Sequence, residues 1–143
     1  MRIAELLEDR ASADIVSCPP GVALREAVRL LADHRIGALP VIEGGAVVGI
    51  VSERDVLYCL AAHGAGALDK SVGEVMTAPV VSVDCATSCT EALALMTARR
   101  FRHLPVVEGG TMRGFLSIGD LVKVRLTEVS HEAEAMRDYI RLA

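Results

Sequence analysis

Hydrophobic and polar residues follow one another along this chain in short blocks typical of small helices and strands. Apolar residues recur every three or four positions from Leu24 to Arg35, which predicts an amphipathic helix. Two apolar runs follow at Ala38–Glu43 and Ala46–Ser52. The glycine pair between them tolerates the positive φ angles of a tight turn, so the two runs predict a β-hairpin. A helix from about Glu53 to His63 completes the unit.

The same order of elements returns 65 residues later. A helix is predicted from Ser88 to about Arg100, a hairpin with strands at His103–Glu108 and Thr111–Ser117, and a last helix from about Ile118 to the end of the chain. Shorter elements are predicted around these: a helix at residues 3–8, strands at Ile15–Ser17 and Val80–Val83, and a short helix or half-turn at Val72–Met76.

Identities between the two units show that they are repeats. Leu39-Pro40-Val41 recurs as Leu104-Pro105-Val106, and both units have a Glu-Gly-Gly turn. The residues Gly49, Ser52 and Asp55 recur as Gly114, Ser117 and Asp120. One unit is too small to bury its own sheet, so we predict an α+β fold in which two pseudosymmetric repeats pack sheet to sheet. The divisions expected are 1–66 (first repeat with an N-terminal helix), 67–126 (second repeat) and 127–143 (an extension of the last helix).

Composition restricts the class of protein. The 143 residues are 52% hydrophobic and 24% charged, as in a globular protein, and only 3% are aromatic. The net charge is −4 and no run is rich in Lys or Arg, which argues against a nucleic-acid or membrane partner. We find no signal peptide and no apolar stretch of the ~18 residues needed to span a bilayer. The sequence therefore predicts a cytoplasmic protein with four reduced, structural cysteines and no metal site.

Each repeat places a serine where its second strand ends and an aspartate three residues later in the first helical turn. Ser52 and Asp55 could accept the two vicinal hydroxyls of a ribose. They could equally cap the helix and complement its dipole without any ligand. The second pair, Ser117 and Asp120, does not decide between these readings, because duplication copies caps as readily as sites.

The order strand, helix, LPV strand, EGG turn, G-x-x-S-x-x-D and helix, twice over, resembles a pair of cystathionine-β-synthase (CBS) domains forming one Bateman module. The resemblance covers residues 11–126. Such modules typically bind AMP, ADP, ATP or, less often, NAD or S-adenosylmethionine, and have no chemistry of their own. The resemblance implies two sites, one formed by Ser52, Asp55, Thr77, Ala78 and Val80, and the other by Ser117, Asp120, Ser12, Ala13 and Ile15.

Basic residues near these positions suggest contacts to phosphate. Arg54 lies in a helical turn whose free amides also attract anions. Arg102 and His103 precede the second LPV strand, at a position where the family often has basic residues facing the central cleft, whereas the first repeat has Gly37-Ala38. We therefore expect the cleft bordered by Arg102 and His103 to prefer more phosphate charge. Each arginine could instead be a solvated surface residue.

The last helix carries an apolar stripe beyond the second repeat. Its members are spaced 4, 3, 4, 3 and 4 residues apart: Val122, Leu126, Val129, Ala133, Met136 and Ile140. The stripe could dock onto the chain's own module or pair with a second subunit, and the homodimer is the favoured alternative.

The leading hypothesis is a regulatory module that binds an adenine nucleotide, with AMP first and NAD(H) possible, and signals to an unidentified effector protein. No cofactor is required. The alternative is a structural or protein-interaction module with empty clefts. An enzyme is not expected, because the sequence offers no nucleophile with an adjacent base, no metal cluster and no paired carboxylates in one cleft.

Overall fold

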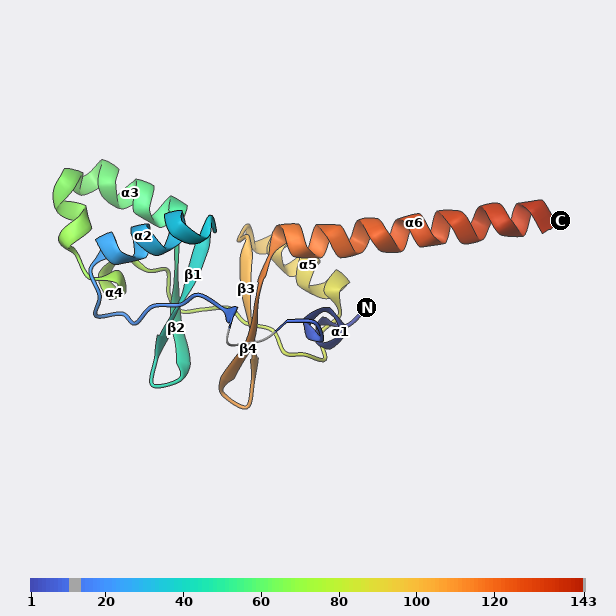
Figure 1. Cartoon of the computed structure of the whole chain (residues 1–143), viewed down its shortest axis with the longest axis horizontal. Coiled ribbons are helices and arrows are strands. Elements are labelled where there is room, and N and C mark those ends of the chain that lie inside the picture. The colour runs from blue at the N-terminus through green and yellow to red at the C-terminus, as the bar shows by residue number, and fades with distance from the viewer. Residues whose placement is uncertain (11–13, 143) are drawn as a thin grey trace.

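The computed structural model describes residues 1–10 and 14–142. Figure 1 shows two similar halves side by side, with one long helix leading away from the second half. The α+β fold and every predicted helix and hairpin are confirmed, within one residue at each boundary. The helices are α1 (Ile3–Leu7), α2 (Leu24–His34), α3 (Glu53–His63), α4 (Val72–Val75), α5 (Cys89–Arg99) and α6 (Ile118–Leu142), with a 3-10 helix η2 (Gly64–Asp69); the strands are β1 (Ala38–Glu43), β2 (Ala46–Ser52), β3 (His103–Glu108) and β4 (Thr111–Ser117).

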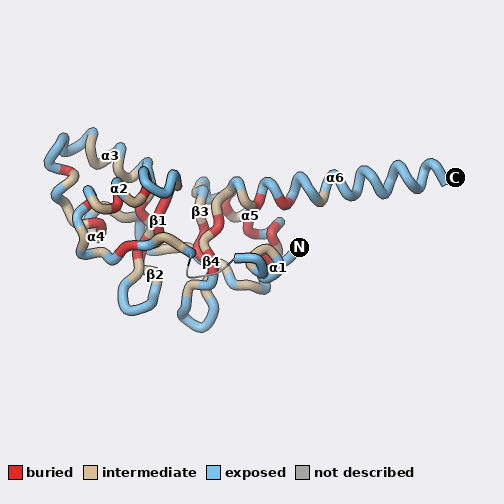
Figure 2. The backbone as a smooth tube through the Cα atoms, in the orientation of Figure 1, coloured by how far each residue is buried: buried red, intermediate tan, exposed pale blue. Residues whose placement is uncertain are grey.

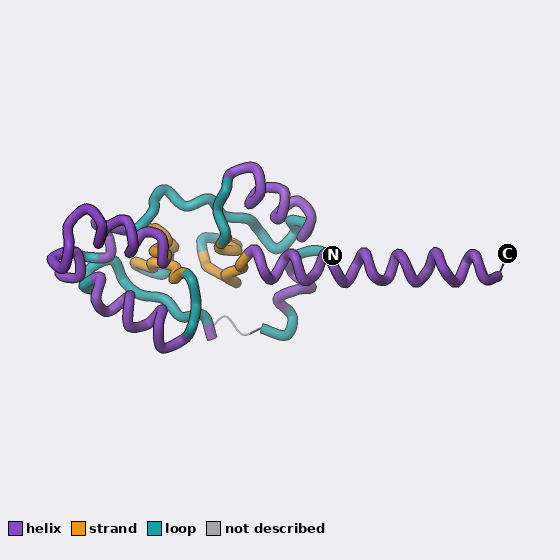
Figure 3. The backbone as a smooth tube through the Cα atoms, turned by 90° about the horizontal axis from the view of Figure 1, so that it is seen from above, coloured by secondary structure: helices purple, strands orange, loops and turns teal. Residues whose placement is uncertain are grey.

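The two antiparallel hairpins have the same register. In the first, Ala38 pairs with Ser52, and in the second His103 pairs with Ser117. Both hairpins shift register at the equivalent position, between Val41 and Ile42 in β1 and between Val106 and Val107 in β3. The strands β2 and β4 contact each other, and the view in Figure 3 places the two hairpins together with the helices outside them. The predicted packing of sheet against sheet is therefore confirmed.

The short strands predicted at Ile15–Ser17 and Val80–Val83 are wrong as strands. In the first half, the residue after the predicted strand, Cys18, makes a single parallel bridge to Val41; in the second, Val83 makes one to Val106. The pairing stops after Cys18 because the next two residues are prolines, which have no N–H to donate. After Val83 it stops because the carboxylate of Asp84 accepts two following backbone N–H groups and turns the chain.

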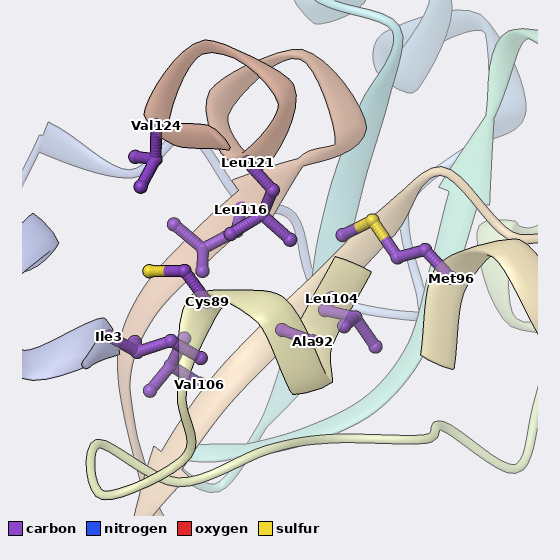
Figure 4. Close-up of a cluster of buried hydrophobic side chains, with 9 residues drawn as sticks. All are labelled: Ile3, Cys89, Ala92, Met96, Leu104, Val106, Leu116, Leu121 and Val124. Atoms are coloured by element: carbon purple, nitrogen blue, oxygen red, sulfur yellow. The ribbon is translucent and has the colours of Figure 1, made fainter. Parts of the chain in front are cut away.

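The core is divided between the two halves, and the short helices are exchanged between them. Ile3 of α1 is fully buried in the second core, where Figure 4 shows it with Val106 of β3 and Cys89 of α5. Val72 of α4 is fully buried in the core of the first half. The division of the chain at residue 66 stays a prediction, because the two packed cores do not follow a single cut in the sequence.

Only the first turns of α6 pack against the module. Leu121 and Val124 are buried, whereas every residue from Val129 to Leu142 is exposed, as the pale blue rod in Figure 2 shows. The structure therefore does not show the stripe docked onto its own module. Within residues 1–10 and 14–142, no helix combines the length and the apolar character that crossing a bilayer requires.

Candidate functional site

The junction between β2 and α3 is built as a capping box. The Asp55 backbone N–H donates to Ser52 Oγ at 3.2 Å, and the Ser52 N–H donates to Asp55 Oδ2 at 2.9 Å. The Glu53 N–H donates to the carbonyl of Gly37 at 3.0 Å, which fixes the start of α3 to the residue before β1. The capping role that the sequence left open is therefore present in the structure.

The second oxygen of the Asp55 carboxylate faces another segment of the chain. Thr77 Oγ1 donates to Asp55 Oδ1 at 3.0 Å. The backbone of Thr77 is held in place by two hydrogen bonds with Ile50 of β2, at 2.8 and 3.0 Å. The structure thus brings together Ser52, Asp55 and Thr77, which the sequence analysis assigned to one site.

These residues border a cleft of about 790 Å³, which we call the Ser52 cleft. Seven of the predicted site residues line it: Ser52, Arg54, Asp55, Thr77, Val80, Arg102 and His103. Ala78, which the sequence analysis placed here too, is exposed but does not line the cleft. The volume is within the range of about 300–1,000 Å³ that is common for small-molecule sites.

Arginines dominate the charge of the Ser52 cleft. Arg54, Arg100 and Arg102 line it together with the acids Glu53 and Asp55, so its lining carries one excess positive charge. Arg100 was not among the site residues predicted from the sequence. A signal existed, because Arg100 coincides with another arginine, Arg35, when the repeats are aligned with an offset of 65 residues.

Arg35 and Arg100 also share an unusual backbone conformation. Each follows the last residue of a helix, α2 or α5, with a positive φ of 52° and 59° respectively. A left-handed conformation is uncommon for residues other than glycine. Both repeats therefore end the helix with the same conformation and direct an arginine towards a cleft, because Arg35 lines the cleft of the other half.

Ser117 and Asp120 form the equivalent capping box of the second repeat, at the junction of β4 and α6. The Ser117 N–H donates to Asp120 Oδ2 at 2.8 Å, and Asp120 N–H donates to Ser117 Oγ at 3.2 Å. The other oxygen, Oδ1, accepts from Arg10 NH2 at 3.1 Å. Burial alone would raise the pKa of Asp120, but the hydrogen bonds from Arg10 and Ser117 outweigh it and hold this pKa below its usual value.

The cleft beside this pair, the Ser117 cleft, has a volume of about 570 Å³. Ile15, Ser117 and Asp120 line it as predicted, while Ser12 and Ala13 lie outside the described residues. Its charged lining residues balance, with three arginines and three aspartates: Arg10, Arg35, Arg113, Asp9, Asp14 and Asp120. The described lining is therefore less positive than that of the Ser52 cleft, in the direction that the sequence analysis expected.

His103 lies between the two clefts and lines both. Its ring stacks on Phe115, with centroids 5.5 Å apart and the ring planes 12° from parallel. Burial lowers the pKa of His103, and Arg102 adds to the effect, although Asp120 and Glu53 oppose it. Burial therefore favours the neutral form of the His103 ring, whereas Arg54, Arg100 and Arg102 bring positive charge to the Ser52 cleft.

The cysteines lie apart from the clefts. Cys18 and Cys89 are buried in the two cores, and burial raises the pKa of each thiol. None of the four lines either cleft. In the described part of the chain, no group of three His, Cys, Asp or Glu side chains is arranged to hold a metal ion.

Comparison with known proteins shows which protein family this chain resembles. The family model described as CBS domain matches residues 4–62 and again 72–127. A CBS domain-containing protein of Bacillus subtilis, YhcV, is 29% identical over 135 residues, which are 88% of this chain and 96% of YhcV. The mitochondrial CBS domain-containing protein CBSX3 of Arabidopsis thaliana is 33% identical over 129 residues, and there the chain covers 63% of the relative. Inosine-5'-monophosphate dehydrogenase of Mycobacterium tuberculosis is 36% identical over 113 residues, but the match covers only 20% of that enzyme.

Solved structures of CBS-domain proteins are similar to this chain as well. A CBS-domain containing protein of Agrobacterium tumefaciens has a TM-score of 0.81 and 38% identity, with 87% of this chain and 99% of that chain covered. CBSX2, solved in complex with AMP, has a TM-score of 0.76 and 27% identity, with 88% and 96% covered. This chain belongs to the CBS domain family and carries two copies of the domain.

Proposed function

We propose that this protein is a regulatory sensor that binds an adenosine-containing ligand in the Ser52 cleft and signals its occupancy to an effector protein. The observation that carries the proposal is the placement of Ser52, Asp55 and Thr77 at the edge of a cleft lined by three arginines. The AMP complex of CBSX2, a related protein of the same fold, supports an adenine nucleotide as the ligand.

The chemistry of the cleft suits each part of such a ligand. Asp55 is half-buried and ends in acceptor oxygens, which suit the vicinal hydroxyls of a ribose. Val80 and Ile50 supply aliphatic surface for a flat base. Arg54 and Arg102 carry guanidinium groups, which suit a phosphate.

A bound ligand would have to compete with hydrogen bonds that the Asp55 carboxylate already accepts within the protein. Both Asp55 oxygens already accept protein hydrogen bonds, so a ribose hydroxyl would share Oδ1 with Thr77 or displace it. A ligand that displaces Thr77 Oγ1 from Asp55 would change a contact next to the segment that enters the second half, because Thr77 is fixed to β2 and precedes that segment. AMP is the proposed first ligand, and NAD(H) is the second to test.

A second candidate function is a ligand-free structural or protein-interaction module. One observation favours it: the capping boxes satisfy Ser52 and Asp55 inside the protein without any ligand. In either case we propose that the chain works as a homodimer and performs no catalytic step of its own.

Calorimetric titration with AMP, ADP, ATP and NADH tests the proposal on the wild type, Asp55→Asn and Asp120→Asn. Asparagine preserves the shape of the side chain but removes its charge. We expect saturable AMP binding that Asp55→Asn weakens at least about tenfold, the value of one lost charge-assisted hydrogen bond. Asp120→Asn serves as the matched control in the other cleft. No saturable binding of any of the four compounds by the wild type would leave the ligand-free module as the better account.

A further inference from the structure

The outer face of α6 presents an apolar stripe that no segment within residues 1–10 and 14–142 covers. Its large side chains are between 41% and 66% exposed: Val122, Leu126, Val129, Met136 and Ile140. The 3-4 spacing keeps the stripe on one side of the helix from residue 122 to residue 140, a length of about 27 Å at 1.5 Å per residue.

The helix attaches to its own module through a different face. Leu121 and Val124 are buried against the second core, and Glu128 accepts a hydrogen bond from the amino group of Met1 at 3.2 Å. These three residues are spaced at helical intervals and form one face. Val122 and Leu126 lie roughly 100° to 200° around the helix from them, so the contact with the module cannot extend to cover the stripe.

The free half of α6 also needs a partner to be a stable helix. Residues 129 to 142 are all exposed, and a helical segment of 14 residues without tertiary packing is marginal in water. An apolar stripe flanked by charged residues is the pattern of a helix that packs along another helix.

We propose that α6 pairs with α6 of a second copy of this chain as a parallel two-stranded coiled coil. The stripe supplies the heptad a and d positions, with Leu126, Ala133 and Ile140 at a, and Val122, Val129 and Met136 at d. The interface uses neither cleft, so the proposal does not rest on nucleotide binding.

The charges beside the stripe select the parallel orientation. Glu132 occupies a g position and Arg137 the e position five residues later. In parallel, in-register pairing, Glu132 of each copy lies beside Arg137 of the second copy, which gives two symmetric ion pairs. Antiparallel pairing that overlaps the whole stripe instead brings Glu132 near its own equivalent, and Lys123 near Arg137, so like charges meet.

The first test is the mass of the full chain in solution, measured by light scattering over a dilution series without nucleotide. The wild type is expected to be a dimer. Leu126→Glu and Ile140→Glu should each raise the dimer dissociation constant by at least about a hundredfold. His131→Glu places the same side chain on the opposite face of α6 and should leave the dimer unchanged. A monomeric wild type, or a dimer that survives both stripe substitutions, overturns the proposal, and the latter would place the interface on the CBS repeats.

The second test determines orientation. Ile140→Cys should form a disulfide between two copies under mild oxidation, because parallel pairing places the two 140 positions side by side. Asp138→Cys, on the outer face, is the matched control and should not. Peptide mass spectrometry distinguishes this disulfide from any formed by the four native cysteines. If the Ile140→Cys dimer does not cross-link, the two 140 positions are not side by side and the parallel, in-register coil is refuted. Nucleotide titration of the monomeric Leu126→Glu variant keeps this result separate from the proposed function.

Discussion

Replacing Ser52 by alanine separates the two roles that its hydroxyl can have. Ser52 Oγ accepts the Asp55 N–H at 3.2 Å and donates to Asp55 Oδ2 at 3.0 Å. Ser88 at the start of α5 is the matched control, because its Oγ accepts the Glu91 N–H at 3.0 Å in a capping box of the same kind. Ser88 lines neither cleft. The two substitutions therefore remove similar caps, and only one of them removes a candidate ligand contact.

The magnitudes follow from these hydrogen bonds. Loss of an N-cap costs about 1 kcal/mol of unfolding free energy, so each variant should melt about 4 °C below the wild type. Ser52→Ala should be the less stable of the two, because it also loses the bond to the Asp55 carboxylate. A neutral hydrogen bond to a ribose contributes about 1 kcal/mol, so Ser52→Ala should raise the AMP dissociation constant about fivefold.

Urea unfolding and calorimetric titration at one temperature measure both effects on the same preparations. Ser88→Ala should bind AMP as tightly as the wild type despite its lower stability. If Ser52→Ala loses stability and retains full affinity for AMP, the hydroxyl only caps the helix. If Ser88→Ala weakens binding equally, the effect arises from general destabilisation, and the assignment of Ser52 to the ligand is refuted.

Two further predictions concern the Asp120 ion pair and the glycine in β2. Arg10→Ala should raise the pKa of Asp120 towards its usual value. A carboxyl group whose pKa is lowered in the folded state stabilises the fold above about pH 4, and this stabilisation is lost as the pH falls through the folded-state pKa. The wild type should therefore be more stable than Arg10→Ala at pH 6, and the difference in stability should shrink below about pH 4. Thermal unfolding across pH measures this, and a constant difference would contradict it. Gly49→Ala should destabilise the fold by about 1–3 kcal/mol, because its new Cβ would meet the Met76 side chain. Gly21→Ala is the control, because no non-neighbouring atom lies within 4 Å of its Cβ position. Urea titration measures the stability of both variants.

Most of the fold could be predicted from the sequence because its signals are local. A Glu-Gly-Gly turn between two apolar runs sets each hairpin, and the structure has Gly44 and Gly45 at positive φ as that turn requires. The short strands before α2 and α5 were predicted wrongly because strand length depends on where backbone partners end. The two prolines after Cys18 and the turn at Asp84 end the pairing of these segments, and the apolar pattern alone does not include their effect.

The candidate site was predictable where the repeat marked it and not where contacts are distant in sequence. Ser52, Asp55 and Thr77 were grouped through the family resemblance, and the structure joins them. Arg10 was missed because it meets Asp120 across 110 residues, and nothing in the local pattern points to that contact. His103 was assigned a basic role, but burial, which only the folded structure reveals, lowers its pKa.

The exchange of short helices makes the two repeats interdependent. The second core contains Ile3 from the beginning of the chain, and the first core contains Val72 from beyond the first repeat. A protease cut within η2, between Gly64 and Asp69, would therefore leave two fragments that each hold part of the other's core. Neither half should fold alone, and the pair should stay associated after cleavage. We therefore expect the duplicated chain to unfold as one cooperative unit rather than as two repeats that separate at their sequence boundary.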